Sequence, residues 1–266
     1  MIDVISIYYN KVKKVGILFI SKKCKYIILT ILIFSSILTT TILANSSMNN
    51  ISNLQQKLDS IMKSEEKVAY LTFDDGPTIK ETPKILDILQ EENVKATFFV
   101  VGKHVKELPQ IVKREYEEGH YIANHGYSHN NKVLYKEFKN EIINTDIEIR
   151  KAIQVEDYCS YIFRFPNGYK SKMYVKEKRK AVEILEELNY AYIDWNCLNK
   201  DSEYKISNYQ LIKNIEDTSK GKNTLVILMH DTSDVNKSSI VLSATIKNLK
   251  NKGYIFKNMY DILDEK

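Results

Sequence analysis

Residues 67–77 read KVAYLTFDDGP, and this stretch decides the fold. The six residues 68–73 form a short apolar run, and a Gly-Pro pair closes the stretch. A short apolar run that ends in turn residues is typical of a buried β-strand. Adjacent residues of a strand point in opposite directions, so the two aspartates at its end, Asp74 and Asp75, are expected to have different roles.

Similar short apolar runs recur along the chain and alternate with amphipathic stretches. The expected strand and helix pairs are 68–73 with 83–92, 96–101 with 105–118, 121–124 with 134–154, 161–165 with 175–188, 190–195 with 209–219 and 224–229 with 239–250, followed by a last strand at 254–256. Repeated alternation of this kind predicts a parallel sheet covered by helices. About seven such units in roughly 200 residues favour a closed or nearly closed (β/α) barrel over an open doubly wound sheet.

The charge of the chain is concentrated at its start. Six lysines and one aspartate give residues 1–25 a net charge of +5, which equals the net charge of all 266 residues. The remainder is neutral, which argues against a general nucleic-acid binder because such a protein keeps its basic excess on the folded domain. A composition of 44% hydrophobic and 27% charged residues excludes a disordered or collagen-like chain.

Residues 26–44, YIILTILIFSSILTTTILA, contain no charged side chain. At about 1.5 Å per residue, a helix of this length nearly crosses a hydrocarbon layer about 30 Å thick. The preceding lysines predict a cytoplasmic start and an extracytoplasmic remainder. A cleaved signal peptide is the alternative, although the run exceeds the usual apolar length of about 7–15 residues. We therefore expect a basic cytoplasmic segment at 1–25, a signal anchor at 26–44, a polar linker at 45–66 and a single folded domain at 67–266.

The three cysteines are too few for a disulfide framework, and their spacing is not that of metal ligands. Cys24 falls at the expected cytoplasmic edge of the membrane. Cys159 and Cys197 would be exported together, and the sequence leaves open whether they pair or remain separate thiols.

Polar clusters follow five of the expected strands, and in a parallel barrel these strand ends meet at one mouth. The clusters are DDGP at 74–77, HGYSH at 125–129, RFPNG at 164–168, DWN at 194–196 with Asp201 beyond it, and HD at 230–231. Two histidines four residues apart can face one point, and with one carboxylate they make a three-ligand metal site with open positions. A metal cation and an arginine would also offset the cost of two adjacent buried carboxylates.

In order and spacing, these clusters resemble the motifs of the polysaccharide deacetylases of carbohydrate esterase family four, the NodB-type domain. The family motifs are T-F-D-D-G, H-[ST]-x-x-H, R-x-P-[YG], a D-W-containing stretch and L-x-H, and the match spans about residues 68–263. The resemblance implies a distorted (β/α) barrel of about seven parallel strands. It also implies a divalent metal, usually zinc with cobalt or another ion as alternatives, held by Asp75, His125 and His129.

The same resemblance implies roles for the other polar residues. Asp74 would be the general base, paired with Arg164, and His230 would donate a proton to the leaving amine. Asp201 is the first choice as the carboxylate partner of His230, and Asp194 is the second.

Three further residues are expected around the reacting acetyl group. The backbone N–H near Asn167 would meet the oxyanion. Trp195 and Leu228 would form the wall of the pocket for the acetyl methyl group, although Trp195 is equally well explained as a core residue.

Some positions depart from the family pattern or lie outside it. Gly126 stands where a hydroxyl residue is usual, and Asn130 stands where proline is common, so the loop that carries both histidines is expected to be looser. His104 and His120 match no motif and are assigned to the surface or to packing. The basic run at 176–180 is assigned to a solvated helix face.

The function implied is metal-dependent removal of acetyl groups from N-acetylated sugars of a cell-surface polysaccharide, with peptidoglycan N-acetylglucosamine as the first choice. N-acetylmuramic acid, chitooligosaccharide, exopolysaccharide and O-acetyl substrates are alternatives within the family. Outside it, a non-catalytic glycan-binding barrel and an iron oxygenase with a similar ligand triad remain. The expected partners are the polysaccharide and the membrane, with no nucleic acid and no protein partner.

Overall fold

The computed structural model describes residues 54–203, 205–232 and 238–263, which fall in one compact unit, Asn50–Lys266. The expected basic segment and membrane anchor, residues 1–44, lie outside the described residues. In the part of the chain that is described, no helix has the length and apolar character needed to cross a membrane.

All strands of the described residues join one parallel sheet, as the alternation of runs predicts. They are β1 (Val68–Asp74), β2 (Thr97–Val100), β3 (Tyr121–Asn124), β4 (Ile162–Phe163), β5 (Ala191–Tyr192), β6 (Cys197–Leu198), β7 (Thr224–His230) and β8 (Ile255–Lys257). Their order is β5-β4-β3-β2-β1-β7-β6, and β8 pairs with β1. The expectation of a parallel α/β barrel is therefore confirmed in its coarse form.

The barrel is distorted because β5 and β6 lie at opposite edges of the sheet, and no ladder joins them among the described residues. Residues 193–196, between β5 and β6, cross the gap between these two edge strands. Ile193 N donates to Phe163 O on β4, whereas Asn196 N donates to Val226 O on β7. The sequence does not predict β6, because a two-residue strand after a polar residue is too short to show a periodic pattern.

Strand β1 occupies the centre of the sheet. It pairs along its whole length with β7, its last three residues pair with β2, and its first three pair with β8. The register sets Asp74 opposite His230, and Asp231 N donates to Asp74 O over 2.8 Å. The ladder thus places two of the expected site residues side by side.

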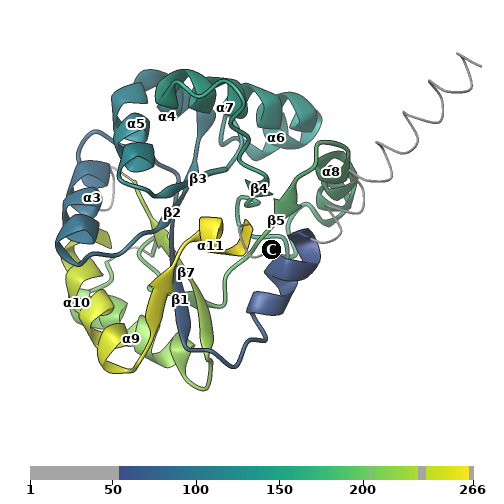
Figure 1. The fold of residues 1–266 in the computed structure, drawn as a ribbon. Coiled ribbons are helices and arrows are strands. Elements are labelled where there is room, and N and C mark those ends of the chain that lie inside the picture. Colours follow the sequence, from purple (N-terminus) through teal and green to yellow (C-terminus); the bar gives the residue numbers. More distant parts are fainter. Residues whose placement is uncertain (1–53, 204, 233–237, 264–266) are drawn as a thin grey trace, which may run out of the picture. The chain divides into compact units, whose positions relative to one another are not determined.

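Nine helices of the described residues are labelled, and they lie around the outside of the sheet except for α11, which lies on its inner side (Figure 1). They are α3 (Glu81–Glu91), α4 (Gly102–Glu107), α5 (Pro109–Glu117), α6 (Asn131–Lys136), α7 (Phe138–Ile153), α8 (Val175–Glu187), α9 (Asn208–Ser219), α10 (Ser238–Asn251) and α11 (Met259–Leu263). Two expected helices are each divided. The first divides at Pro109, which takes the first helical position of α5 and lacks the N–H that a continuous helix needs. The second divides at Glu137.

Side chains alternate between two cores along β1. Ala69, Leu71 and Phe73 belong to the outer cluster, which contacts α3, α5, α9 and α10. Val68 and Tyr70 belong to the inner cluster. Thr72 and Asp74 therefore point to the inside of the barrel, as the two-residue period of a strand requires.

A helix over residues 54–61 lies inside the stretch that was assigned to a linker, and it packs against the domain. Leu58 on this helix is 1% exposed and lies in the inner cluster. The Gln55 side chain bonds both backbone groups of Tyr192 on β5. The folded unit therefore begins before residue 67.

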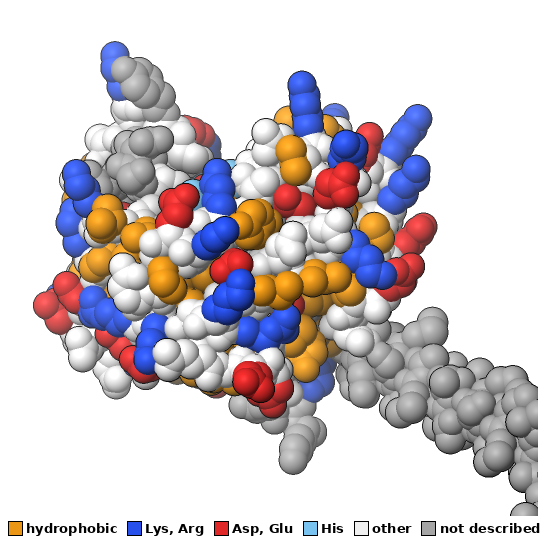
Figure 2. All heavy atoms as spheres, turned by 90° about the horizontal axis from the view of Figure 1, so that it is seen from above, with side chains coloured by type: hydrophobic (Ala, Val, Ile, Leu, Met, Phe, Trp, Pro, Cys, Tyr) orange, Lys and Arg blue, Asp and Glu red, His pale blue; other side chains and the backbone are white. Residues whose placement is uncertain are grey.

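The face drawn in Figure 2 carries basic and acidic side chains next to one another. This mixture agrees with the balanced charge of the chain after residue 25.

Replacement of Leu58 by alanine tests whether the 54–61 helix stabilises the domain. The substitution removes a buried side chain, so we expect the free energy of unfolding in urea to fall by about 2–5 kcal/mol. Ser60→Ala on the exposed side of the same helix should change it by less than about 0.5 kcal/mol. Equal stabilities for Leu58→Ala and the unmodified protein would show that the helix is dispensable.

Candidate active site

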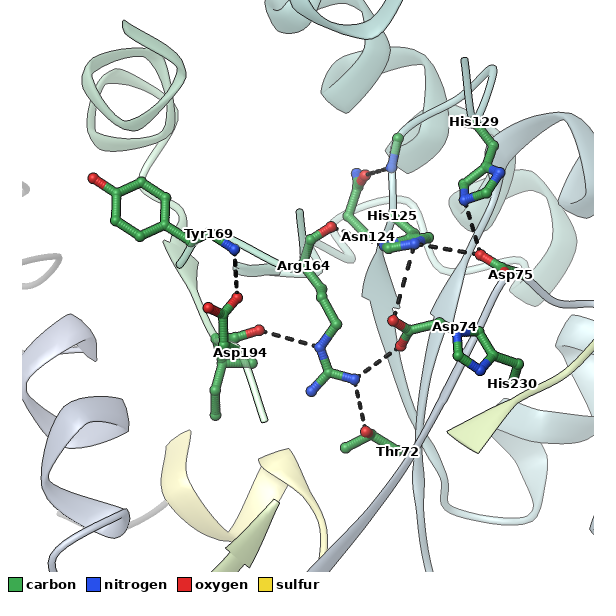
Figure 3. Close-up of polar contacts among 12 residues, drawn as sticks. Thr72, Asp74, Asp75, Asn124, His125, His129, Arg164, Tyr169, Asp194 and His230 are labelled. Carbon is green, nitrogen blue, oxygen red and sulfur yellow. Dashed lines mark hydrogen bonds and ion pairs between the residues drawn. The ribbon is translucent and has the colours of Figure 1, made fainter. Parts of the chain in front are cut away.

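The inward-facing Asp74 meets a buried arginine (Figure 3). Arg164 is 0% exposed, and its Nη1 donates to Asp74 Oδ1 over 2.8 Å and to Thr72 Oγ1 over 2.6 Å. Its Nε donates to Ile193 O, and its guanidinium lies 3.9 Å from the centre of the Phe99 ring. Arg164 therefore compensates the charge of Asp74 through Oδ1. The other carboxylate oxygen, Oδ2, lies 4.0 Å from His125 Nε2.

Asp75 turns away from Asp74 because its backbone is left-handed, with φ of 79°. Its Oδ1 lies 2.9 Å from His129 Nε2 and 3.4 Å from His125 Nε2. Burial opposes ionisation of this carboxyl, but hydrogen bonds and charges from the two histidines outweigh burial and hold its pKa well below the ordinary value. The two aspartates thus face different partners as expected, but through the left-handed turn at Asp75, which lies beyond the end of β1, and not through strand alternation.

The two motif histidines differ in how they are held. His125 is buried at the end of β3, and its Nδ1–H donates to Arg164 O over 2.8 Å, which leaves Nε2 as the free ligand atom. His129 has φ of 51° and a side chain that is 37% exposed. Its hydrogen bond to Asp75 raises its pKa.

Asp75, His125 and His129 offer one ligand atom each, and the three atoms lie within 4.8 Å of one another. One carboxylate and two imidazoles make a donor set that suits zinc and leaves positions for water and substrate. Orientation of His125 by a backbone carbonyl is typical of histidine ligands. The residues therefore fit a divalent metal.

His230, at the end of β7, pairs with Asp201, the first choice from the sequence. Nδ1 of His230 lies 2.6 Å from Asp201 Oδ1, and the backbone N–H of His230 donates to Oδ2 over 2.7 Å. The Ser238 hydroxyl donates to the same Oδ2. Burial disfavours the imidazolium, but the hydrogen bond and charge of Asp201 outweigh it and raise the pKa of His230 to about 9.

Asp194, the second choice, has different contacts. Its two oxygens accept the N–H groups of Tyr169 and Lys170 over 2.7 and 3.0 Å (Figure 3). It therefore fixes the turn that follows Pro166. The structure places Asp201, and not Asp194, beside His230.

The same turn is held from the other side by Lys178. This side chain is 1% exposed, and its Nζ donates to the carbonyls of Gly168 and Ser171. The assignment of the whole 176–180 run to a solvated face is therefore wrong at Lys178. Asn167 lies in this turn with φ of 65°, and its backbone N–H takes part in none of the hydrogen bonds found among the described residues.

Trp195 and Leu228 lie near the site, Trp195 in contact with the inner cluster and Leu228 on the strand that ends in His230. Trp195 is half-buried, packs against the inner cluster and lies 5.8 Å from the Arg164 guanidinium. A side chain at Gly168 would approach the Trp195 ring to 3.0 Å. Leu228 is buried on β7 opposite Thr72. A pocket for the acetyl methyl group stays a prediction.

The structure adds two residues that the motifs did not reveal. His104, assigned from the sequence to a surface or packing role, donates from Nδ1 to the carbonyl of Asp75 over 2.8 Å. Asp231 is buried and accepts hydroxyl hydrogen bonds from Thr78 and Thr82. Burial raises the pKa of Asp231 to about 7. The sequence pointed to Asp231 only through its position directly after His230.

The two departures from the family pattern do not leave the histidine loop unsupported. Asn130 takes the N-cap position of α6, where its side-chain oxygen accepts the N–H groups of Lys132 and Val133. Gly126 has φ of 83°, a conformation that favours glycine.

Comparisons with known proteins agree with this site. The sequence profile of the family described as polysaccharide deacetylase matches residues 62–193. A peptidoglycan-N-acetylglucosamine deacetylase of Listeria monocytogenes is 33% identical over 205 residues, which are 77% of this chain and 40% of that protein. A peptidoglycan-N-acetylmuramic acid deacetylase of Bacillus subtilis is 31% identical over 220 residues, which are 81% of this chain and 80% of that protein.

Among solved structures, the Bc1960 peptidoglycan N-acetylglucosamine deacetylase, bound to an N-hydroxybenzamide compound, matches with a TM-score of 0.64 and 34% identity. The match covers 74% of this chain and 88% of that one. The fold, the strand-end residues and these similarities lead to one conclusion: the chain belongs to the polysaccharide deacetylases of carbohydrate esterase family four.

Proposed function

We propose that the protein is a metal-dependent hydrolase that removes acetyl groups from N-acetylated sugars of peptidoglycan, with N-acetylglucosamine as the first choice. The observation that carries the proposal is the grouping at the ends of β1 and β7. There, Asp74 with its buried Arg164 stands in register with His230 and its partner Asp201. A charged carboxylate and a charged imidazole on neighbouring strands suit a reaction that needs a base and an acid.

The metal would be held by Asp75, His125 and His129, and zinc is the first candidate. When bound, it would polarise the acetamide carbonyl and lower the pKa of a water molecule. The ligand atoms must be unprotonated for this, so metal binding would displace the proton that the hydrogen bond to Asp75 stabilises on His129, whose pKa is raised.

Asp74 takes the proton of the attacking water, and the hydrogen bond from Arg164 orients this carboxylate. The unpaired backbone N–H of Asn167 supplies a hydrogen bond to the developing oxyanion. His230 gives its proton to the nitrogen as the C–N bond breaks. Water and the acetamide thus yield acetate and the free amine.

N-acetylmuramic acid is the second candidate, because a relative with that named activity matches as much of this chain as the others do. We place the catalytic domain outside the membrane, on a single-pass anchor at 26–44 or as a secreted form after cleavage. This location rests on the lysine-flanked apolar run and would bring the enzyme to its polymer.

Acetate release by the purified protein, stripped of metal and then given zinc, tests the proposal. We expect release from peptidoglycan only after zinc is added, and less from chitooligosaccharides. Analysis of the product sugars distinguishes free glucosamine from free muramic acid units. A folded, zinc-loaded protein that releases no acetate from either polymer would leave the glycan-binding alternative as the better account.

Asp74→Asn separates the base from the metal ligands. We expect zinc binding to persist while kcat falls by about 10²–10⁴-fold, because the amide cannot accept the proton of water. Asp75→Ala should lose zinc and activity together. Near-normal turnover in Asp74→Asn, measured with zinc content in the same sample, would contradict the role of Asp74.

The fall in rate at high pH, the alkaline limb of the pH–rate profile, should report the deprotonation of His230. Because its pKa is raised to about 9, the proton is retained at neutral pH, and kcat/KM should fall as pH rises above about 9. Asp201→Asn removes the charge that stabilises the imidazolium, so the limb should move to lower pH by about 1–3 units. Asp217→Asn, a change at an aspartate on α9 that pairs with Lys220, is the control and should leave the limb in place. An unmoved limb in Asp201→Asn would refute this pairing.

A further inference from the structure

The three residues between the two motif histidines are held by side chains. Gly126 N donates to Asn124 Oδ1 over 2.9 Å. Tyr127 N and Ser128 N donate to a single oxygen, Glu141 Oε2, over 2.9 and 2.8 Å, and the Ser128 hydroxyl donates to it over 3.1 Å. Each backbone N–H of this segment is therefore bound by a side-chain oxygen.

Glu141 lies in the first turn of α7 and is 5% exposed. No ion pair among the described residues joins it to a cation, so the three donors of residues 127 and 128 compensate its charge. Hydrogen bonds to a buried carboxylate are stronger than those between neutral groups, and they fix geometry as well. Glu141 thus acts as an anchor between a helix of the barrel wall and the histidine segment.

Glycine at 126 permits this contact. A side chain there would come to 2.9 Å from Leu134 and 3.4 Å from Glu141 Oε2. Glycine replaces the usual hydroxyl residue at position 126, and the segment lies close to Glu141 there.

The two histidines depend on the segment to different degrees. His125 is buried and is held by the Arg164 carbonyl. His129 is more exposed, and its imidazole has Asp75 as its hydrogen-bond partner. The position of His129 therefore depends on the backbone at its two sides, which Glu141 holds at Ser128 and the N-cap of α6 holds at Asn130.

We infer that Glu141 is a positioning residue for the metal site, which sets the place of His129 relative to Asp75 and His125. The inference rests on the metal site of the proposed function. Loss of a partner in the shell around a metal ligand typically weakens metal binding by about 10–100-fold. The effect of Glu141 should therefore be transmitted through His129.

The test measures zinc affinity of the full-length protein by competition with a chromophoric chelator, together with urea unfolding of the metal-free forms. We expect Glu141→Ala to bind zinc about 10–100-fold more weakly. Glu141→Gln keeps an acceptor oxygen and should lie closer to the unmodified protein. Glu148→Ala, on the same helix and paired with exposed Lys151, is the matched control and should bind zinc normally.

A second background separates positioning from general destabilisation. In His129→Ala, the ligand that Glu141 positions is gone, so adding Glu141→Ala or Glu141→Gln should weaken zinc binding little further. Equal losses in both backgrounds, or unchanged zinc affinity in a folded Glu141→Ala variant, would overturn the inference. The Gln variant serves the same comparison where the Ala variant does not fold.

Zinc binding and acetate release together distinguish failure of the proposed function from failure of this inference. If the unmodified protein binds zinc but releases no acetate, the hydrolase is refuted and the zinc measurements on Glu141 still stand. If the unmodified protein binds no zinc, both are refuted.

Discussion

The contact between Arg164 and Asp74 is the interaction on which the rest of the site depends. The buried guanidinium joins Asp74 and Thr72 on β1 to the carbonyl of Ile193, in the segment that spans the open side of the barrel. The carbonyl of the same arginine orients His125. Removal of one partner from a buried ion pair costs about 3–5 kcal/mol, so the base, one ligand and the barrel closure would be disturbed together.

Two ion pairs lie at the ends of the neighbouring strands β1 and β7, and the carboxylate and the cation have exchanged positions between them. On β1 the proposed base is a carboxylate and the cation of Arg164 supports it, whereas on β7 the proposed acid is an imidazole and the carboxylate of Asp201 supports it. The parallel ladder between β1 and β7 fixes the separation of Asp74 and His230. Backbone hydrogen bonds, rather than flexible loops, therefore set the distance between Asp74 and His230, the two residues proposed to transfer protons.

Much of this arrangement could be predicted from the sequence, because the apolar runs are long enough to show and polar residues cluster at their ends. Asp75, His125 and His129 come together as expected. The sequence did not reveal His104 or the burial of Lys178, since each depends on a contact with a backbone group of another loop. Strand β6 was missed because a two-residue strand carries little periodic signal. The 54–61 stretch shows Leu54, Leu58 and Ile61 at helical spacing, but the polar residues around them led to its assignment as a linker and not as part of the folded unit.

Two of the three ligand residues, Asp75 and His129, have left-handed backbones, at φ of 79° and 51°. This conformation costs of order 1 kcal/mol for a residue with a side chain, and glycine would avoid the cost. The cores of the barrel include neither residue, so their contribution to folding is limited to the ion pairs that Asp75 makes with the two histidines. Chemistry and fold are separable here: descendants of such a protein can lose the reaction by a single change and still inherit an intact glycan-facing barrel.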